Sequence, residues 1–285
     1  MKIENYLPKL AEKFPTLYIE GIEGVLQTIK TRINISEAAK KLNLSENALR
    51  NITNSKSRCP LRILKILMEI TSQNLLDEVY EKVTFLGGKT FTNRIKVPKE
   101  LTPELAYFAG ALRDGALSTY KSELVISQLN KDWLEKEIKP ILEKIFGVKV
   151  KIKGPRKKDN CYYIKLRSVA LFAIIKTLLE WDKLMWKTPS IILKAPLEYQ
   201  KEYVRGFWDA EGSNEKDGGV VLYQAWPSTN ECPPLSDIAW MLRKINIDSW
   251  FRKPQKGTNK PVHVLYIPKR YKQLFFATLK PFYQY

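Results

Sequence analysis

The chain has 285 residues, and its 48 lysines and arginines outnumber the 30 acids, giving a formal net charge of +18. That length allows two or three compact units, and that charge favours a polyanionic partner such as a nucleic acid. The single histidine, His263, excludes histidine-dependent nucleases and Ser-His triads, and the three cysteines form no CxxC pair that would indicate a zinc finger.

Cysteine usage and hydropathy give expectations about location. We interpret the three cysteines as free thiols of a reducing compartment, and we therefore expect a cytoplasmic protein. The sequence opens without a visible signal peptide, and no run reaches the roughly 18 apolar residues that a membrane span needs. A membrane is therefore not among the expected partners.

Residues 1–74 are predicted to form a helical unit with little strand character. Within it, residues 35–52 have the pattern of a helix-turn-helix: Asn43 suits the left-handed turn, and Ser45 caps the second helix. The side chains expected to point outward, as on a recognition helix in a major groove, are Glu46, Asn47, Arg50 and Asn51, and Asn47 and Arg50 are the candidate DNA contacts. A purely structural helical bundle is the alternative for this segment. Residues 75–99 lose periodicity and contain Gly87, Gly88 and Pro98, so they are predicted to be a linker.

Residues 100–195 are predicted to form a first half-domain. Thr102 caps its first helix, Pro103 begins that helix and Gly115 ends it. The elements expected next are strands over 116–120 and 123–128, a helix over 132–146, strands over 148–153 and 161–166, and a closing helix over 169–179.

The strand over 148–153 alternates strictly between apolar and basic residues, so one of its faces is apolar and the other is cationic. The basic residues of this strand and of the turn after it are Lys149, Lys151, Lys153, Arg156, Lys157 and Lys158. Such a ribbon suits a sheet laid along a DNA groove. An edge strand protected from aggregation by its lysines is the alternative.

Residues 196–285 repeat this order as a second half-domain. A hairpin turn over 217–219 leads into a strand over 220–224, and further elements are expected over 235–245, 248–253, 262–267 and 271–279. Arg252 and Lys253 lie on the second-half strand that corresponds to the lysine-rich one, and they are candidate DNA contacts.

Two similar helical runs, over residues 105–115 and 201–212, each end in an acid directly before a glycine. Asp114 and Glu211 are 97 residues apart (211 − 114), a period that fits duplicated half-domains rather than solenoid repeats. If the two helices cross through their small residues, the acids meet at the base of the crossing. Two neighbouring carboxylates repel unless a cation lies between them, so the pair predicts a Mg²⁺ site suited to phosphodiester hydrolysis. The alternative is that both acids merely end helices, although an acid there opposes the helix dipole.

The runs 206–212 (GFWDAEG) and 109–115 (AGALRDG) resemble the motifs of the LAGLIDADG homing endonucleases, in the single-chain form with two motifs. The resemblance implies an α+β fold in which two αββαββα halves are related by a pseudo-twofold axis and form a saddle over DNA. Asp114 and Glu211 would then bind Mg²⁺, or another divalent cation such as Mn²⁺, and cut both strands.

The family also has glutamines and a lysine near its site. Gln128 and Gln224 resemble those glutamines, and they lie 96 residues apart (224 − 128) at the ends of corresponding strands. Lys187 resembles the site lysine, with Lys183 as a competitor. No second lysine is apparent in the second half, so the chemistry at the two strands is expected to be unequal.

The first motif departs from the family pattern at Arg113. Alignment on the acids puts Ala109 opposite Gly206, and it puts Arg113 opposite Ala210, where a small residue is expected. Either the crossing is displaced there, or Arg113 runs along the interface to a phosphate or a carboxylate. Asp209 lies two residues before Glu211 and so points about 200° away from it, which predicts a solvated or capping role rather than metal binding.

The leading interpretation is a monomeric, sequence-specific endonuclease that acts on double-stranded DNA and spreads with an intron or similar element. The N-terminal helix-turn-helix would lengthen its site. A DNA-binding transcription regulator without catalysis, or an intron maturase that binds RNA, is the alternative on the same fold.

Overall fold

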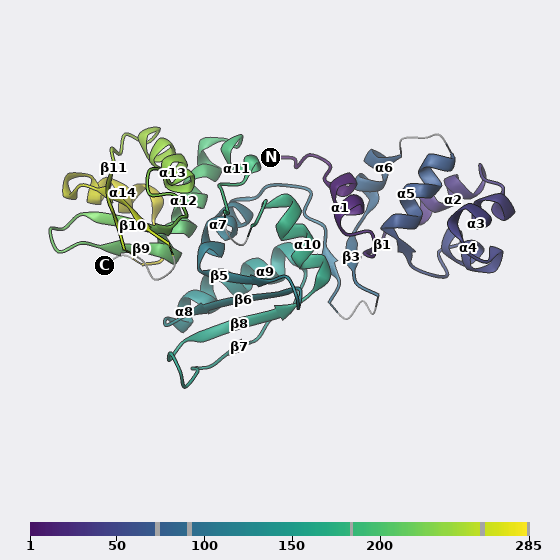
Figure 1. Ribbon diagram of the computed structural model, residues 1–285, viewed down its shortest axis with the longest axis horizontal. Coiled ribbons are helices and arrows are strands. Elements are labelled where there is room, and N and C mark those ends of the chain that lie inside the picture. Colours follow the sequence, from purple (N-terminus) through teal and green to yellow (C-terminus); the bar gives the residue numbers. More distant parts are fainter. Residues whose placement is uncertain (72–74, 90–92, 183–184, 257–259, 284–285) are drawn as a thin grey trace.

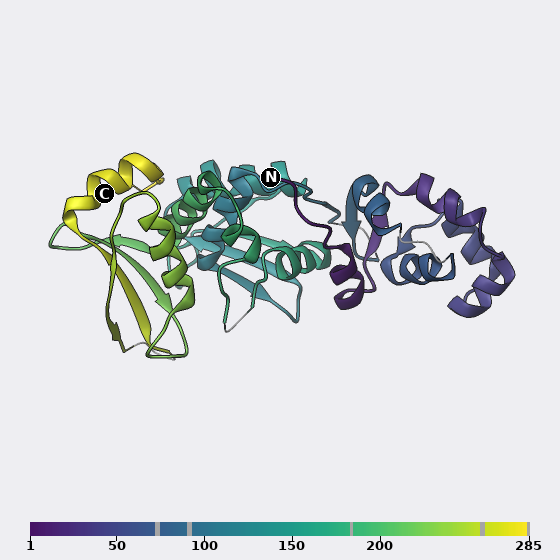
Figure 2. The ribbon, with the colours of Figure 1, turned by 90° about the horizontal axis from the view of Figure 1, so that it is seen from above.

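The computed structural model describes residues 1–71, 75–89, 93–182, 185–256 and 260–283, except for the side chains of Leu76 and Asp114. Along its longest axis the chain forms an N-terminal unit, a first half-domain and a second half-domain (Figure 1). The view from above shows the same succession (Figure 2). The described strands form three four-stranded sheets. None of the helices in the described ranges is long and apolar enough to cross a membrane.

The N-terminal unit combines helices with a small sheet. Its helices are α1 (Leu7–Lys13), α2 (Glu23–Lys30), α3 (Ile35–Leu42), α4 (Glu46–Thr53), α5 (Leu61–Ile70) and α6 (Leu76–Lys82). Its strands are β1 (Tyr18–Glu20), β2 (Cys59–Pro60), β3 (Phe85–Gly87) and β4 (Ile95–Lys96), in the order β2-β1-β3-β4. The linker predicted over 75–99 is therefore wrong. This segment supplies α6, β3 and β4, and it buries Val79, Val83 and Leu86 in the core.

The predicted pair of helices in this unit is present as α3 and α4. Asn43 between them has φ 53° and ψ 47°, the left-handed conformation expected there. Ser45 caps α4 by accepting a hydrogen bond from the backbone N–H of Ala48, at 3.2 Å. Asn47 and Arg50 are exposed on α4, and Arg50 forms an ion pair with Glu46 at 3.4 Å. DNA contact by this face stays a prediction.

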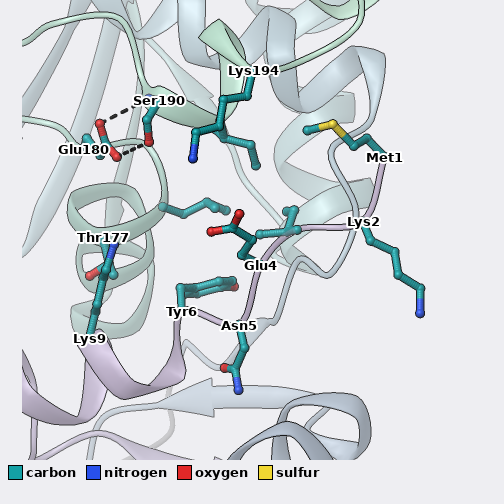
Figure 3. Close-up of a pocket in the computed structure, with 13 residues that line it drawn as sticks. Met1, Lys2, Glu4, Asn5, Tyr6, Lys9, Thr177, Glu180, Ser190 and Lys194 are labelled. Atoms are coloured by element: carbon teal, nitrogen blue, oxygen red, sulfur yellow. Dashed lines mark hydrogen bonds between the residues drawn. The ribbon is translucent and has the colours of Figure 1, made fainter.

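The N-terminal unit docks on the first half-domain through α1. The rings of Phe14 and Phe172 meet edge to face across this junction, with centroids 6.0 Å apart. Within the N-terminal unit, the Tyr6 hydroxyl donates to the carbonyl of Pro98 at 3.1 Å. A cleft of about 260 Å³ lies beside Tyr6. Figure 3 shows Lys9, Glu4 and Lys194 around it. The cleft belongs to the junction of the two units.

The first half-domain follows the predicted order. Its elements are α7 (Pro103–Ala111), the 3₁₀ turn η1 (Leu112–Asp114), β5 (Gly115–Ser118), β6 (Glu123–Gln128), α8 (Lys131–Trp133), the π turn η2 (Leu134–Ile138), α9 (Lys139–Phe146), β7 (Ile152–Lys153), β8 (Tyr162–Arg167) and α10 (Val169–Leu178). The strand predicted over 148–153 is shorter than expected, because only Ile152 and Lys153 pair with β8. The alternation before it is nevertheless real, since Val148 and Val150 are buried and the lysines between and after them are exposed.

The second half-domain repeats the architecture of the first. The short helix α11 (Ser190–Leu193) precedes this half-domain, whose elements are α12 (Leu197–Glu211), β9 (Gly212–Asn214), β10 (Val220–Ala225), α13 (Pro233–Arg243), β11 (Trp250–Gln255), β12 (Val262–Ile267), the 3₁₀ turn η3 (Lys269–Tyr271) and α14 (Lys272–Leu279). The sheet orders β5-β6-β8-β7 and β9-β10-β12-β11 correspond strand for strand. The α+β fold with two αββαββα halves is thereby confirmed. The sequence did not predict the short helix α11 between them.

Candidate active site at the helix crossing

The first helices of the two halves, α7 and α12, cross through a glycine from each. A Cβ atom on Gly110 would lie 2.1 Å from the carbonyl oxygen of Tyr203, and a Cβ atom on Gly206 would lie 2.0 Å from the carbonyl oxygen of Tyr107. Real Cβ atoms do not approach oxygen so closely, so only glycine allows this packing. The predicted crossing through small residues is therefore present, and the two contacts are equivalent, with the roles of the two helices exchanged.

The contacts also correct the alignment of the two motifs. Gly110 and Gly206 are 96 residues apart (206 − 110), as are Tyr107 and Tyr203 (203 − 107). Gly110, and not Ala109, therefore stands opposite Gly206 at the contact. The acids are offset by 97 residues, so the first motif reaches its acid with one residue fewer.

The 3₁₀ turn at the end of α7 makes up for the missing residue. From Gly110 to Asp114 the chain takes one α-helical step and then the three steps of the turn Leu112–Asp114, a rise of about 7.5 Å. From Gly206 to Glu211 it takes five α-helical steps within α12, which is again about 7.5 Å. Both acids thus lie at the same height beyond the crossing.

Strand pairing fixes the register of the residues after each acid. The glycine after each acid pairs with an inner strand, through the partners Gly115–Ile126 and Gly212–Leu222. Gln128 and Gln224 lie two residues beyond these partners, and therefore on the same face of their strands. The predicted equivalence of the two glutamines is confirmed by this register, whereas their catalytic role stays a prediction.

The donor set fits a hydrated divalent cation. Glu211 is half-buried at the end of α12, and the Oε1 atom of Gln224 is buried without a hydrogen-bond partner among the described residues. A water molecule on a carboxylate-bound cation would satisfy such an oxygen. The side chain of Asp114 and the whole of Lys183 lie outside the described residues. Among the described side chains, no group of three or more His, Cys, Asp or Glu residues is placed to hold a metal.

Arg113 runs along the interface between the halves. Its guanidinium donates to the carbonyl of Trp186 at 2.6 Å, to the carbonyl of Lys187 at 3.1 Å and to the hydroxyl of Tyr203 at 2.9 Å. It also lies 4.3 Å from the centre of the Trp186 ring. The sequence left open a displaced crossing or a side chain that runs along the interface to a phosphate or a carboxylate. Arg113 does run along the interface, but its hydrogen-bond partners are two backbone carbonyls and a hydroxyl.

Asp209 is the counterpart of Arg113, 96 residues later (209 − 113). Its carboxylate accepts hydrogen bonds from the Tyr107 hydroxyl at 2.8 Å and from the backbone N–H groups of Phe282 and Tyr283 at 3.1 and 3.2 Å. The side chain is buried, so the predicted solvated or capping role is wrong. Burial raises the pKa of Asp209 to about 6, against the lowering effect of its hydrogen bonds.

The segments held by these two side chains correspond as well. Trp186 and Lys187 are 96 residues before Phe282 and Tyr283. The place that Lys187 occupies after the first closing helix is thus occupied by Tyr283 after the second. Lys187 is exposed, and its catalytic role stays a prediction.

The outward faces of the two sheets, which point away from the helices, differ in charge. In the first sheet this face carries the exposed Lys153, Lys165 and Arg167, and Glu123 pairs with Lys165 at 2.9 Å. Lys149, Lys151, Lys157 and Lys158 are exposed beside it. Arg156 is paired with Asp159 at 2.6 Å.

In the second sheet the outward face is largely apolar. Val221, Val264 and Tyr266 form a buried cluster on it, and the Trp250 ring packs beside Tyr266 with centroids 5.2 Å apart. Arg252 lies over the Tyr266 ring and is paired with two acids, Glu215 at 3.5 Å and Asp217 at 3.3 Å. Of the two basic residues predicted here, Arg252 is therefore neutralised, whereas Lys253 is exposed.

Comparison with known proteins gives a family match in the second half. Residues 198–280 match the model of the LAGLIDADG-like domain. The chain is 34% identical over 151 residues to homing endonuclease I-ApeI from Aeropyrum pernix, which covers 50% of this chain and 66% of that protein. The chain thus spans slightly less than two thirds of this relative.

A second relative is much longer than the chain. The glutamine--fructose-6-phosphate aminotransferase of Methanocaldococcus jannaschii is 24% identical over 287 residues, which cover 92% of this chain but only 24% of that protein. Among solved structures, I-DmoI in complex with DNA and Mn matches with a TM-score of 0.47 and 18% identity, covering 64% of this chain and 98% of that one.

Proposed function

Because residues 198–280 match the LAGLIDADG-like domain and the chain is 34% identical over 151 residues to homing endonuclease I-ApeI, we propose that it is a sequence-specific, metal-dependent endonuclease of the homing type that cleaves both strands of DNA. The observation that carries the proposal is the crossing of α7 and α12 through Gly110 and Gly206, with one acid at equal height beyond the contact on each helix. A pure binding protein has no physical need for two acids that oppose their helix dipoles at matched places. The relative I-ApeI is named a homing endonuclease.

In this proposal Asp114 and Glu211 hold a divalent cation, Mg²⁺ or Mn²⁺, at the ends of the crossing segments. When bound, the cation would lower the pKa of a bound water and stabilise charge on the scissile phosphate. Gln128 and Gln224, on equivalent strands beside the acids, would orient the attacking waters. Lys187 would stabilise charge at one site, and the second site would work with Tyr283 in the corresponding place.

The duplex would lie against the outward faces of the two sheets. The exposed lysines of the first sheet would neutralise phosphates, and they supply much of the sequence-independent affinity. The second sheet would contribute mainly apolar and aromatic contacts, since Arg252 is already paired with Glu215 and Asp217. Asn47 and Arg50 on α4 would extend the contact to a further part of the DNA.

Cleavage of a DNA library tests the proposal. The protein would be incubated with Mg²⁺ and plasmids that carry randomised duplex inserts, and cut molecules would be recovered and sequenced. We expect one preferred site, cut on both strands. Asp114→Asn and Glu211→Gln should each convert double-strand cleavage into nicking, while leaving DNA affinity within about threefold. Glu198→Gln removes an exposed acid from the first turn of α12, and it should leave cleavage unchanged. DNA binding with no cutting at any site would reject the nuclease and favour a regulator.

A further inference from the structure

Arg113 and Asp209 have opposite charges, but each holds a backbone segment against a crossing helix by hydrogen bonds. Each extends from the end of a crossing helix to the segment that follows the closing helix of one half. The first segment turns two carbonyl groups toward the crossing, and carbonyls need a donor, which arginine supplies. The second segment turns two N–H groups toward the crossing, and amides need an acceptor, which aspartate supplies. In each half, one side chain of the crossing helix therefore holds this segment by two hydrogen bonds, and we call these bonds the tether. The side chain donates the bonds in the first half and accepts them in the second.

The tether in the first half ends on Lys187 itself. Arg113 binds the carbonyl of this residue and of the residue before it, while the Lys187 side chain remains exposed. The neighbouring residues are fixed independently. The Trp186 indole donates to the carbonyl of Leu179 at 3.3 Å, and Thr188 is 3% exposed. The backbone at Lys187 is therefore held on both sides, and its exposed side chain starts from a point fixed at the Arg113 guanidinium.

We infer that Arg113 is a positioning residue, which holds Lys187 in place for cleavage at one of the two sites, and that Asp209 holds Tyr283 at the corresponding place of the other. This inference rests on the proposed endonuclease function. It predicts two unequal sites, one with a tethered lysine and one without. A displacement of about 1 Å in such a group can reduce a rate by up to about a hundredfold, so loss of the tether should appear in the rate for one strand.

A double-mutant cycle measured on each strand separately tests the inference. The substrate is a duplex with the preferred site and a different fluorophore on each strand. Lys187→Ala should slow one strand by about tenfold to a hundredfold. Arg113→Met, which keeps the length and the packing on Trp186 but removes the donors, should slow the same strand. The double variant should match Lys187→Ala within about twofold, because Arg113 acts through Lys187. Arg113→Lys, which retains a donor, should recover part of the rate.

Two matched variants keep the test specific. Asp209→Asn loosens the segment that carries no lysine, so it should leave the Lys187-dependent strand at its normal rate. Lys194→Ala removes another exposed lysine, and it should change neither strand. Equal slowing of both strands by Arg113→Met, or effects of Arg113→Met and Lys187→Ala that multiply in the double variant, would overturn the inference while the endonuclease stands.

Hydrogen exchange measures the tether without any cleavage. In Arg113→Met the amides of Lys187 and Thr188 should exchange at least about tenfold faster than in the unchanged protein, because local opening becomes easier. The amides of Phe282 and Tyr283 should be unaffected. Unchanged exchange at Lys187 would refute the tether. If the unchanged protein cuts neither strand, the proposed function fails, and the positioning role fails with it even when the tether is confirmed by exchange.

Discussion

The two halves of this chain have the same backbone architecture, but the side chains at corresponding places differ in charge. Their sheets have corresponding strand orders, and the crossing uses the same pair of contacts in both directions, Gly110 on Tyr203 and Gly206 on Tyr107. Where side chains rather than backbone meet, the halves diverge, as Arg113 and Asp209 show. A close approach of two backbones leaves no choice but glycine, whereas a polar partner of either sign can satisfy a polar segment.

The sheet faces diverge in the same way. The first sheet presents exposed cations, whereas Arg252 of the second is held by Glu215 and Asp217 beside an apolar cluster. A duplex that lies across both faces would therefore meet most of the attraction for its phosphates on the first half. The two halves thus share a scaffold, whereas the outward faces of their sheets differ in charge.

The largest effect is expected at the glycine crossing. Gly110→Ala and Gly206→Ala should each destabilise the fold by at least about 3 kcal/mol, because the added methyl group overlaps a carbonyl oxygen of the other helix. Urea unfolding measures this. Gly88→Ala is the control: its Cβ would meet no described atom within 4 Å, and stability should change by less than about 0.5 kcal/mol. A loss of stability in only one of these two variants would show that the two glycine contacts are not equivalent.

The next largest effect is a pH dependence of the free energy of unfolding that is expected from titration of Asp209 but not of Arg113. The folded-state pKa of Asp209, about 6, lies above its ordinary value of 3.8, so ionising it costs the folded state up to about 3 kcal/mol. Its contribution to stability is therefore greatest below about pH 4 and is lost as pH rises through 6. The stability of Asp209→Asn relative to the unchanged protein should rise over this range in urea titrations.

The control for this pH test is Glu198→Gln, on the same helix but exposed. It should follow the unchanged protein across the range. Parallel pH curves for Asp209→Asn and the unchanged protein would show that the Asp209 carboxyl does not titrate differently in the folded state. Arginine keeps its charge at these pH values. Burial raises the pKa of the half-buried Asp237 carboxyl, however, and the charge of Arg113 opposes this rise. Arg113→Met should therefore raise that pKa further and alter the pH dependence of stability through Asp237, not through Asp209.

The smallest effects are expected from the basic side chains of the two sheets. Replacing Lys149, Lys151 and Lys153 by alanine should reduce the slope of log affinity against log salt by about 2.7, if each lysine neutralises one phosphate. Arg252→Ala should change the slope by less than about 0.5, because Arg252 is already paired with acids. Filter binding over a range of salt concentrations measures both. Equal changes per residue would mean that the two faces contact phosphates alike.

Local patterns of the sequence predicted much of this protein. The capping residues Ser45 and Thr102, the left-handed Asn43 and the glycine after each acid place the ends of helices, because such preferences act within a few residues. The spacing of the acids and glutamines predicted two halves of one design. The segment 75–99 was misjudged, because strands of two or three residues gain stability only from the sheet that they join.

The amino-acid sequence by itself determined the repeated motif, the charge excess and the order of elements. Tertiary structure decided which residues oppose each other at the crossing, since a 3₁₀ turn at Leu112–Asp114 changes the rise per residue and no local pattern indicates it. It also decided what Arg113 and Asp209 hold. Their partners lie more than 70 residues away in the sequence, and the sign of charge needed at each place depends on whether that distant segment offers carbonyl or N–H groups.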